Sequence, residues 1–512
     1  MSTRSGSQRV VTDLLWDAAD AVGSRPAIVL GGQTTTYAEL RGRASSVAAA
    51  LSDRGVKSGD RVAIVAERGV DAVAAYFGAL AAGAVAIIVN ERLRPRQVEY
   101  VLRRSTARVL LASPALLAQY PRPLETDADV VDIGAIANTE GVEWTPRPPG
   151  ERGLAQIIFT SGSSGLPKGV VFSHRAVLAA IEMVSGYLNL GEDDRIFSLL
   201  PFSSVYGLNQ LLCALWKRST LVVSLSSLAS TIVAEAREHQ VTVMAGVPPL
   251  WLQLLATPAF SPAIESLRVL QNAGGHLPVG AVRQLRAAQP QARLFLQYGM
   301  TETFRSTFLP PDEVDLHPDS MGREVPGASI WVVGEDGKLC GSGEVGELVF
   351  SGPTMAEGYW EDEELTAEVF RGAPRFADVG GRAVHSGDMV RRGSDGFLYF
   401  VSRRDRMIKS LGFRIGPDEI VDVLYASGDV LEAAIATEPD SIRGERIIAY
   451  VVLQPGGSQR HLEQFARVEL PRHMQPARIE IRQELPRLAS GKYDISSLPA
   501  SSEDRELAAS HA

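Results

Sequence analysis

The chain has 512 residues, of which 45% are hydrophobic, so it is long enough for more than one domain with sizeable apolar cores. A formal net charge of −9 argues against a basic nucleic-acid-binding surface, and we expect no nucleic-acid partner. The two cysteines, Cys213 and Cys340, are too few for a disulfide framework and favour a reducing, cytoplasmic location.

Helical and extended apolar patterns alternate in the first part of the chain. A helix is predicted from residue 35 to 51, followed by a strand and by a second helix after Val70. Residues 72–89 carry no charged side chain and reach the length of a membrane-spanning helix. Most of this segment is alanine and glycine, and Gly83 ends the helix before a strand, so we expect no membrane span. The alternation predicts parallel βαβ units and doubly wound sheets.

A loop rich in glycine and hydroxyl groups follows the apolar run 155–158, which predicts a buried strand. Residues 160–165 read Thr-Ser-Gly-Ser-Ser-Gly, and Lys168 comes shortly after. Backbone N–H groups, hydroxyls and one ammonium together are suited to binding a polyphosphate. The spacing is neither that of a P-loop nor that of a Gly-x-Ser-x-Gly nucleophile elbow. The alternative interpretation is a flexible surface loop.

The alternation resumes after residue 195, and several predicted strands there run into glycine or proline. Three of them lie at 241–249, 267–275 and 293–299. Ligands bind at the carboxyl ends of strands in open α/β sheets, so we expect the site at these ends.

The pattern of predicted secondary structure changes at Gly322. From there to residue 402, short strands alternate with turns, which predicts a small β-rich subdomain at about 322–402. Charged residues then replace the apolar pattern at 403–409, where we place a domain boundary. We therefore expect a large N-terminal domain at 1–402 and a small α+β domain at 410–512.

A second motif, Gln-Tyr-Gly-Met-Thr-Glu at 297–302, stands at the end of a predicted strand. A glycine at a strand end lets the backbone approach a ligand closely. The hydroxyl of Thr301 suits a phosphate, and the carboxylate of Glu302 suits Mg²⁺, which prefers oxygen ligands and substrate phosphates. Taken alone, the Thr-Glu pair would also fit a helix cap.

These two motifs and five others, in the same order, resemble the acyl-adenylate-forming superfamily. That group includes acyl-CoA synthetases, stand-alone adenylation domains and firefly-type luciferases. The other motifs are Asn-Ala-Gly-Gly-His at 272–276, His-Ser-Gly-Asp at 385–388, the charged run 401–409, Gly-Phe-Arg-Ile at 412–415 and the stretch 485–492 ending in Gly-Lys. The resemblance extends from about residue 35 to 498. It implies an α/β fold with a mobile C-terminal domain.

The resemblance also implies roles for individual residues. Lys492 would be the catalytic lysine of a mobile loop, acting with Glu302, Thr160 and Lys168. Asp405 would be the hinge, and Gly412 would lie on the loop that enters the site for thioester formation. The implied ATP- and AMP-binding residues are Thr160, Ser161, Gly162, Ser163, Ser164, Gly165, Lys168, Gly274, Gly275, His276, Gln297, Tyr298, Gly299, Met300, Thr301, Glu302, Asp388, Arg403 and Lys492. Glu302 is the implied Mg²⁺ ligand.

The segment that would form the acyl pocket departs from the family pattern. It has no acid to hold an α-ammonium group, so free α-amino acids should be poor substrates, and Ser203 or Ser204 stands where relatives have a histidine. Arg305 either faces the acid, which would then carry a polar or anionic group, or turns outward into a surface pair. The residues implied for the pocket are Phe202, Ser203, Ser204, Tyr206, Val247, Asn272, Gly274, Gly299, Arg305 and Ser306.

Together these features predict an ATP- and Mg²⁺-dependent ligase that converts a small-molecule carboxylic acid into acyl-AMP and pyrophosphate. A thiol would then displace AMP, supplied either by CoA or by the phosphopantetheine of a separate carrier protein. One alternative is transfer to a non-thiol nucleophile such as an amine. Another, from a different class, is a non-catalytic nucleotide-binding protein.

Overall fold

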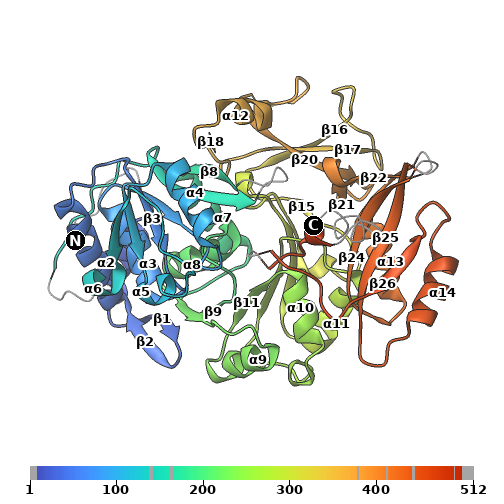
Figure 1. The fold of residues 1–512 in the computed structure, drawn as a ribbon, viewed down its shortest axis with the longest axis horizontal. Helices are drawn as coiled ribbons and strands as arrows, with labels where there is room; N and C mark the ends of the chain where they lie inside the picture. Colours follow the sequence, from blue (N-terminus) through green and yellow to red (C-terminus); the bar gives the residue numbers. More distant parts are fainter. Residues whose placement is uncertain are drawn as a thin grey trace.

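In the computed structural model, four sheets and their covering helices form the chain (Figure 1). The structure describes residues 9–137, 142–161, 167–377, 380–410, 413–440, 444–488 and 491–498. Three sheets belong to the large N-terminal part, and the fourth forms the small C-terminal part. The predicted fold class, α/β with a β-rich subdomain and a following α+β domain, is confirmed.

A nine-stranded sheet carries most of the strands that run into glycine or proline. Its order is β15-β14-β13-β12-β11-β9-β10-β1-β2, parallel from β1 through β13 and antiparallel at both edges. Its strands are β1 (Pro26–Leu30), β2 (Gln33–Thr36), β9 (Arg195–Ser198), β10 (Thr220–Val223), β11 (Val243–Gly246), β12 (Val269–Asn272), β13 (Arg293–Tyr298), β14 (Thr307–Leu309) and β15 (Arg323–Glu324). The helices of this part are α1 (Asp13–Val22), α7 (His174–Tyr187), α8 (Val205–Trp216), α9 (Ala229–Glu238), α10 (Pro248–Leu255) and α11 (Val279–Ala288).

A seven-stranded sheet holds the hairpin of the predicted phosphate loop. Its order is β18-β8-β7-β4-β3-β5-β6. Its strands are β3 (Arg61–Val65), β4 (Val85–Ile88), β5 (Val109–Ala112), β6 (Asp129–Asp132), β7 (Leu154–Ser161), β8 (Pro167–Ser173) and β18 (Gly358–Tyr359). Its helices are α2 (Tyr37–Asp53), α3 (Val70–Ala81), α4 (Pro95–Ser105), α5 (Pro114–Leu117) and α6 (Ile133–Ala137).

The uncharged segment 72–89 forms most of the buried helix α3 and the whole of strand β4, as predicted. Among the described residues, no helix is both long and apolar enough to cross a membrane. The apolar side chains of this segment lie in the interior of the domain, where α2, α3 and the sheet share one core.

The β-rich subdomain is a five-stranded antiparallel sheet with a core that includes Ile330, Leu348, Phe350 and Leu398. Its elements are β16 (Ser329–Val333), β17 (Val345–Ser351), α12 (Glu363–Val369), β19 (Phe370–Gly372), β20 (Arg382–Arg392) and β21 (Leu398–Arg403). The antiparallel pairing fits the short strands and turns of this region.

The small domain forms a separate sheet with its own core. Its elements are β22 (Ile408–Ser410), β23 (Phe413–Ile415), α13 (Pro417–Ala426), β24 (Val430–Asp440), β25 (Gly444–Leu453), α14 (Gln459–Glu469) and β26 (Arg478–Ile481).

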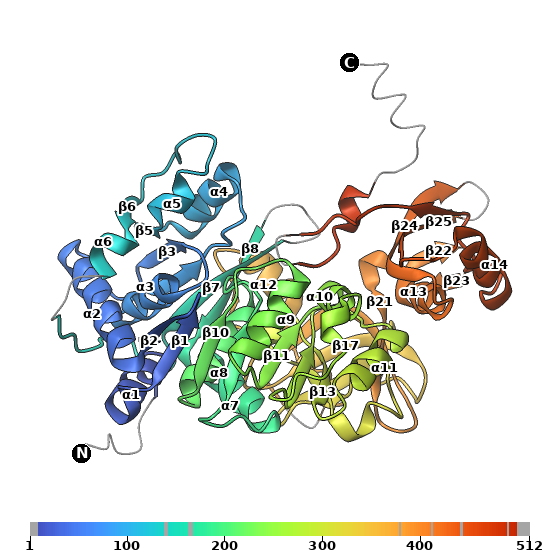
Figure 2. The ribbon, with the colours of Figure 1, turned by 90° about the horizontal axis from the view of Figure 1, so that it is seen from below.

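Short 3₁₀ helices occur in both parts of the chain, at η1 (Pro258–Phe260), η2 (Thr301–Thr303), η3 (Pro311–Glu313), η4 (Arg404–Arg406) and η5 (Ile495–Ser497). Figure 2 shows the last described segment extending from the small domain toward β7 and β8.

The turn between β9 and α8 is unusually tight. The hydroxyl of Ser204 caps the helix by accepting from the Gly207 N–H at 3.1 Å and donates to the Pro201 carbonyl at 3.0 Å. A Cβ at Gly207 would stand 2.1 Å from that same carbonyl oxygen. Only glycine therefore lets α8 begin this close to Pro201, which fixes the position of Tyr206.

Gly207→Ala should destabilise the fold by about 1–3 kcal/mol or more, because the clashing atoms belong to the backbone carbonyls of Pro201 and Leu200 and cannot rotate away. Gly186→Ala in α7 is the control, since nothing lies within 4 Å of a Cβ there and the change should stabilise by about 0.4–1 kcal/mol. Urea unfolding of the two variants measures both effects. A Gly207→Ala protein as stable as the wild type would contradict the tight turn.

Candidate functional site

The hairpin of β7 and β8 brings the two ends of the predicted phosphate loop together. Thr160 pairs directly with Lys168 across the hairpin, so the hydroxyl and the ammonium stand on neighbouring strands. Residues 162–166, which include Gly162, Ser163, Ser164 and Gly165, lie outside the described residues, as does the side chain of Ser161. The phosphate role of this loop stays a prediction.

Glu302 and Thr301 lie on the short helix η2, directly after β13. Tyr359 on β18 donates its hydroxyl to Oε1 of Glu302, and the Ala356 N–H donates to the Glu302 carbonyl at 2.8 Å. These contacts fix the carboxylate close to β8, because β18 pairs with that strand. Among the described residues, no group of three or more His, Cys, Asp or Glu side chains could form a metal cage. A single carboxylate fits Mg²⁺ held mainly by substrate phosphates.

Asp388 is buried on β20, and its two oxygens have different surroundings. Tyr298 donates its hydroxyl to Oδ2, while Oδ1 is buried without a hydrogen-bond partner in the described chain. Arg403 lies 3.5 Å from Oδ1. Burial raises the pKa of this carboxyl, and Arg403 opposes the rise. An unmatched buried acceptor beside an arginine suits the hydroxyl of a sugar.

Lys492 reaches from the small domain to the carboxyl end of β12. A Cβ placed on Gly274 would lie 3.2 Å from Cε and 3.9 Å from Nζ of Lys492. Gly274 also has φ = +83°, a conformation that favours glycine. Gly274 therefore gives the lysine room beside the strand end.

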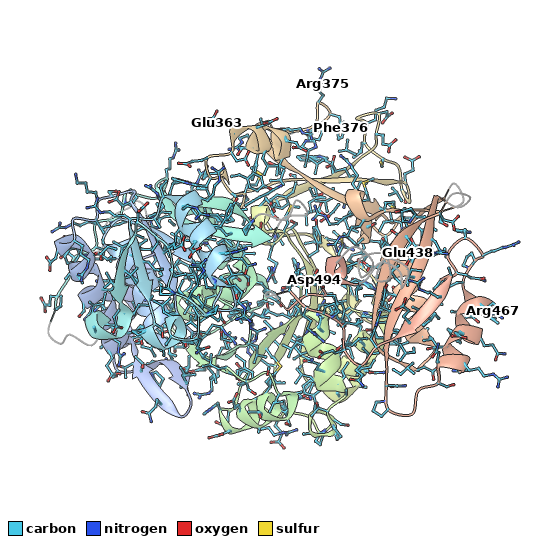
Figure 3. All side chains as sticks on the ribbon, in the orientation of Figure 1. Glu363, Arg375, Phe376, Glu438, Arg467 and Asp494 are labelled. Atoms are coloured by element: carbon cyan, nitrogen blue, oxygen red, sulfur yellow. The ribbon has the colours of Figure 1, made fainter. Side chains whose placement is uncertain are left out.

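A small turn holds Lys492 in place. The Leu488 N–H donates to the Lys492 carbonyl at 2.8 Å, and the Gly491 N–H donates to the Leu488 carbonyl at 2.9 Å. Lys492 as a whole residue is exposed, yet desolvation by the surrounding protein lowers the pKa of its ammonium, an effect that Asp388 opposes. Asp494, two residues further on, lies near the middle of the view in Figure 3.

His276 faces the small domain. Its Nε2 lies 2.9 Å from Oδ1 of Asp422 on α13, so the pair joins the two domains. Burial opposes protonation of His276, but the hydrogen bond and charge of Asp422, aided by Asp418 and Asp319, raise its pKa to about 9. His276 is therefore a cation at neutral pH, and its ring contacts Asp422 in this orientation of the domains.

The predicted hinge is held on its N-terminal side. Arg404 lies 2.8 Å from a carboxylate oxygen of Glu347 on β17, and the Gly387 N–H donates to the other oxygen at 3.0 Å. Burial opposes ionisation of Glu347, but His385, Gly387 and Arg404 outweigh it and lower its pKa to about 2. The side chain of Asp405 and the whole of Gly412 lie outside the described residues, so their roles stay predictions.

The residues predicted for the acyl pocket gather at the carboxyl ends of β9, β11 and β12. Tyr206, Val247 and Ala273 belong to one apolar cluster. Phe202 is buried, Ser203 is half-buried, and Ser204 is occupied as the helix cap described above. Of the two serines that could stand in place of the family histidine, Ser204 thus has a structural role as the helix cap.

Arg305 points inward rather than into a surface pair. Its side chain is 4% exposed, and its guanidinium lies 4.2 Å from the centre of the Tyr206 ring. The preceding residue, Phe304, has φ = +59° and ψ = −68°, a strained conformation that sends its ring into the core against Phe172. A Cβ on Gly299 would lie 2.9 Å from the Arg305 Cα, so this glycine permits the close turn.

The side chains of several other predicted site residues have partners within the chain. The side-chain amide of Gln297 accepts from Arg305 at 3.1 Å and donates to the Tyr187 hydroxyl at 3.0 Å, so it faces the arginine. Ser306 bonds Thr303 at 2.8 Å, and Asn272 donates to the Gly275 carbonyl at 3.2 Å. Met300 packs against the core of the large domain.

Sequence reasoning missed several residues that the fold brings to the site. Asp422 and Tyr359 lie on elements distant in sequence from their partners, and no local pattern singles them out. Asn209 and Gln210 could have been found from the sequence, because they are two amides in an otherwise apolar helix. Buried amides require hydrogen-bond partners.

Comparison with known proteins identifies the class of protein to which this fold and site belong. The sequence matches the AMP-binding enzyme family over residues 15–360 and the C-terminal domain of AMP-binding enzymes over 419–492. The chain belongs to this family, which confirms the resemblance seen in the motifs.

Two relatives illustrate the range of the family. Novobiocin biosynthesis protein H of Streptomyces niveus is 31% identical over 494 residues, covering 93% of this chain and 80% of that protein. Phenyloxazoline synthase MbtB of Mycobacterium sp. (strain MCS) is 32% identical over 482 residues, covering 91% of this chain but only 40% of that protein. The chain thus spans less than half the length of some relatives.

Solved structures share the whole fold. A benzoate CoA ligase from Burkholderia xenovorans is 27% identical with a TM-score of 0.85, covering 96% of this chain and 100% of that one. ATP-bound MatB from Rhodopseudomonas palustris is 26% identical with a TM-score of 0.83, covering 95% and 98%. An anthranilate CoA ligase in complex with anthranoyl-AMP is 23% identical with a TM-score of 0.86, covering 98% and 97%, and shows the fold alone.

Replacing His276 or Asp422 by alanine should slow the step that needs Lys492 in this position, because their ion pair holds the small domain against the large one. For a partly exposed ion pair, we expect the rate of this step to fall roughly fivefold, which corresponds to about 1 kcal/mol of lost interaction free energy. The double variant should lose no more than either single variant, since both remove the same contact. The single-turnover rate of acyl-AMP formation in the two single variants and the double variant measures this coupling.

The same pair should respond to pH. Its contribution is complete below the ordinary histidine pKa of about 6.5 and is lost as pH rises through about 9. The effect of His276→Ala should therefore shrink toward pH 10. His317→Ala, whose partner Asp395 lies within the large domain at 3.4 Å, is the control. An equal, pH-independent effect of both changes would contradict the interdomain role.

Proposed function

We propose that this protein is an AMP-forming acid–thiol ligase. The observation that carries the proposal is the approach of Lys492 to Gly274, with the Asp388 carboxylate near enough to influence the lysine pKa. The lysine and the buried acceptor of Asp388 come from different domains and are suited to opposite parts of one nucleotide. Family membership and the fold shared with CoA ligases support the same reaction.

In the first half-reaction, a carboxylate oxygen of the acid attacks the α-phosphorus of ATP. The bond from that phosphorus to the bridging oxygen breaks, and pyrophosphate leaves with the electron pair. Both reactants are anions, so the Lys492 ammonium would reduce their repulsion as charge redistributes. Oδ1 of Asp388, which has no hydrogen-bond partner in the described chain, would accept from a ribose hydroxyl and hold the nucleotide in register.

The β- and γ-phosphates would face the β7–β8 hairpin. Thr160 and Lys168 offer a hydroxyl donor and an ammonium there, and Thr301 offers a further hydroxyl. Glu302 would hold Mg²⁺, which supplies charge neutralisation on the phosphates when it is bound. The hydrogen bond from Tyr359 keeps this carboxylate oriented.

In the second half-reaction, a thiol attacks the acyl carbonyl carbon and AMP leaves. The acceptor would be CoA or the phosphopantetheine of a separate carrier protein, since relatives include both a CoA ligase and much longer synthases of which this chain matches only a part. The charged segment 403–409 connects the domains, so we expect it to be the hinge of a rotation that withdraws Lys492. A reducing, cytoplasmic location belongs to this proposal, supported by the free cysteines Cys213 and Cys340.

Transfer to an amine remains the alternative within enzymes, because adenylation would proceed in the same way. A non-catalytic nucleotide-binding protein has less support, because Lys492 is held at a strand end where simple nucleotide retention does not require it. Acid-dependent exchange of pyrophosphate into ATP, measured without any acceptor, separates catalysis from mere binding. Absence of exchange with every acid tested would overturn the proposal.

Lys492→Ala should reduce acyl-AMP formation by about 10²-fold or more, the scale expected when one charge-stabilising donor is lost. Conversion of a supplied acyl-AMP to the thioester should proceed normally, because the lysine acts in the first half-reaction alone. Exchange and thioester formation are measured separately. Lys217→Ala, at the end of α8, is the control. Equal loss of both half-reactions would contradict this division of roles.

Free α-amino acids should be poor substrates. The segment 203–206 carries no carboxylate to bind an ammonium group, and burying an unpaired charge is costly. A panel of acids with and without an α-ammonium group tests this in the exchange assay. Preferred use of α-amino acids would show that another residue supplies the missing anion.

A further inference from the structure

Arg305 is a buried cation with one hydrogen-bonding atom left over. Its Nε donates to Gln297 at 3.1 Å, and its Nη1 donates to the Phe304 carbonyl at 3.1 Å. Nη2 is buried and makes no hydrogen bond within the described chain, although the Tyr187 hydroxyl, which accepts from Gln297, lies close to the guanidinium. Among the described residues, no acidic side chain forms an ion pair with this guanidinium. Buried guanidinium groups are normally paired, because an uncompensated charge in the interior is costly.

A second unmatched donor lies on the helix beneath this arginine. Asn209 follows Tyr206 by three residues on α8, so the two side chains share one face of the helix. Its Nδ2 is buried without a partner, while its Oδ1 is 3.6 Å from the sulfur of Cys213. Two donors without acceptors beside Tyr206 favour a ligand that brings acceptor atoms.

This donor pair is connected to the reacting centre by a short series of contacts. The Arg305 guanidinium lies over the Tyr206 ring, and Tyr206 packs with Val247 and Ala273. Val247 in turn lies 3.3 Å from the position of a Cβ on Gly274, the residue beside Lys492. An acid whose carboxylate meets Lys492 could extend along this cluster toward Arg305.

We propose that Arg305, assisted by Asn209, binds a second anionic group on the acid, at the end away from the reacting carboxylate. The substrates would then be dicarboxylic acids or acids with another anionic substituent. This inference rests on the proposed ligase function and adds the class of acid to it. Gln297 acts as a positioning residue, because its amide bonds both Arg305 and the Tyr187 hydroxyl.

The opposing interpretation is that Arg305 only supports the fold through its contact with Tyr206. Such a role would leave the choice among acids unchanged, whereas a binding role would not. Two pairs of acids differ only by carboxylate against methyl at the far end: 4-carboxybenzoate with 4-methylbenzoate, and adipate with hexanoate. The ratio of kcat/KM within a pair, from one preparation, does not depend on the fraction of protein that is folded.

The wild type should prefer the dicarboxylic member of at least one pair. Arg305→Met should lower that preference by roughly 10- to 150-fold, as expected for loss of a hydrogen bond to a charged group. Asn209→Leu should lower it less. The control is Arg293→Met on β13, which also removes an arginine stacked on an aromatic ring, 5.7 Å from the centre of Phe295.

A wild type that prefers the methyl members, or a ratio that Arg305→Met leaves unchanged, would overturn the proposal. Calorimetric titration of the same acids separates failure of this inference from failure of the ligase function. Binding of a dicarboxylic acid that is lost in Arg305→Met would support the arginine's role even if no acid drives exchange. Acid binding that is the same in both proteins would overturn it.

Discussion

The chemistry proposed here depends on bringing a cation between two anions, a carboxylate and a triphosphate. Lys492 can do so only where the small domain lies against the large one, and Gly274 leaves space for it at the end of β12. The ion pair of His276 with Asp422 holds the same orientation from a neighbouring position. The position of Lys492 beside Gly274 therefore depends on both domains together.

The site divides into two sides with different physical character. Glu302, Asp388 and Tyr298 form a polar side in which buried or half-buried acceptors are fixed by tyrosine hydroxyls. The other side is apolar around Tyr206 and Val247 and contains the unmatched donors of Arg305 and Asn209. Phe304 lies between these two sides. Its strained backbone turns its own ring into the core and the Arg305 side chain toward Tyr206. Strain of about 1–3 kcal/mol persists only where the surrounding packing imposes it.

The sequence was sufficient to predict the fold class, the family and the places of the motifs, because strands that run into glycine carry local signals. It could not decide whether Arg305 pointed inward, since that depends on the turn at Phe304 and on packing against α8. It could not pair His276 with Asp422, which lie 146 residues apart. It also gave no sign that the Gln297 side chain bonds Arg305 and Tyr187, and the predicted nucleotide contact of this residue stays a prediction. Contacts between distant elements follow from tertiary packing, which local patterns do not report.

Attack by a carboxylate oxygen of the acid on the α-phosphorus of ATP is the step on which every assigned role depends. An acid that drives pyrophosphate exchange can be labelled with oxygen-18 in its carboxylate and turned over with a thiol acceptor. The account predicts that one labelled oxygen per turnover appears in AMP, as mass spectrometry would detect. Label found in inorganic phosphate or pyrophosphate instead, with AMP unlabelled, would contradict attack at the α-phosphorus and with it the role assigned to Lys492.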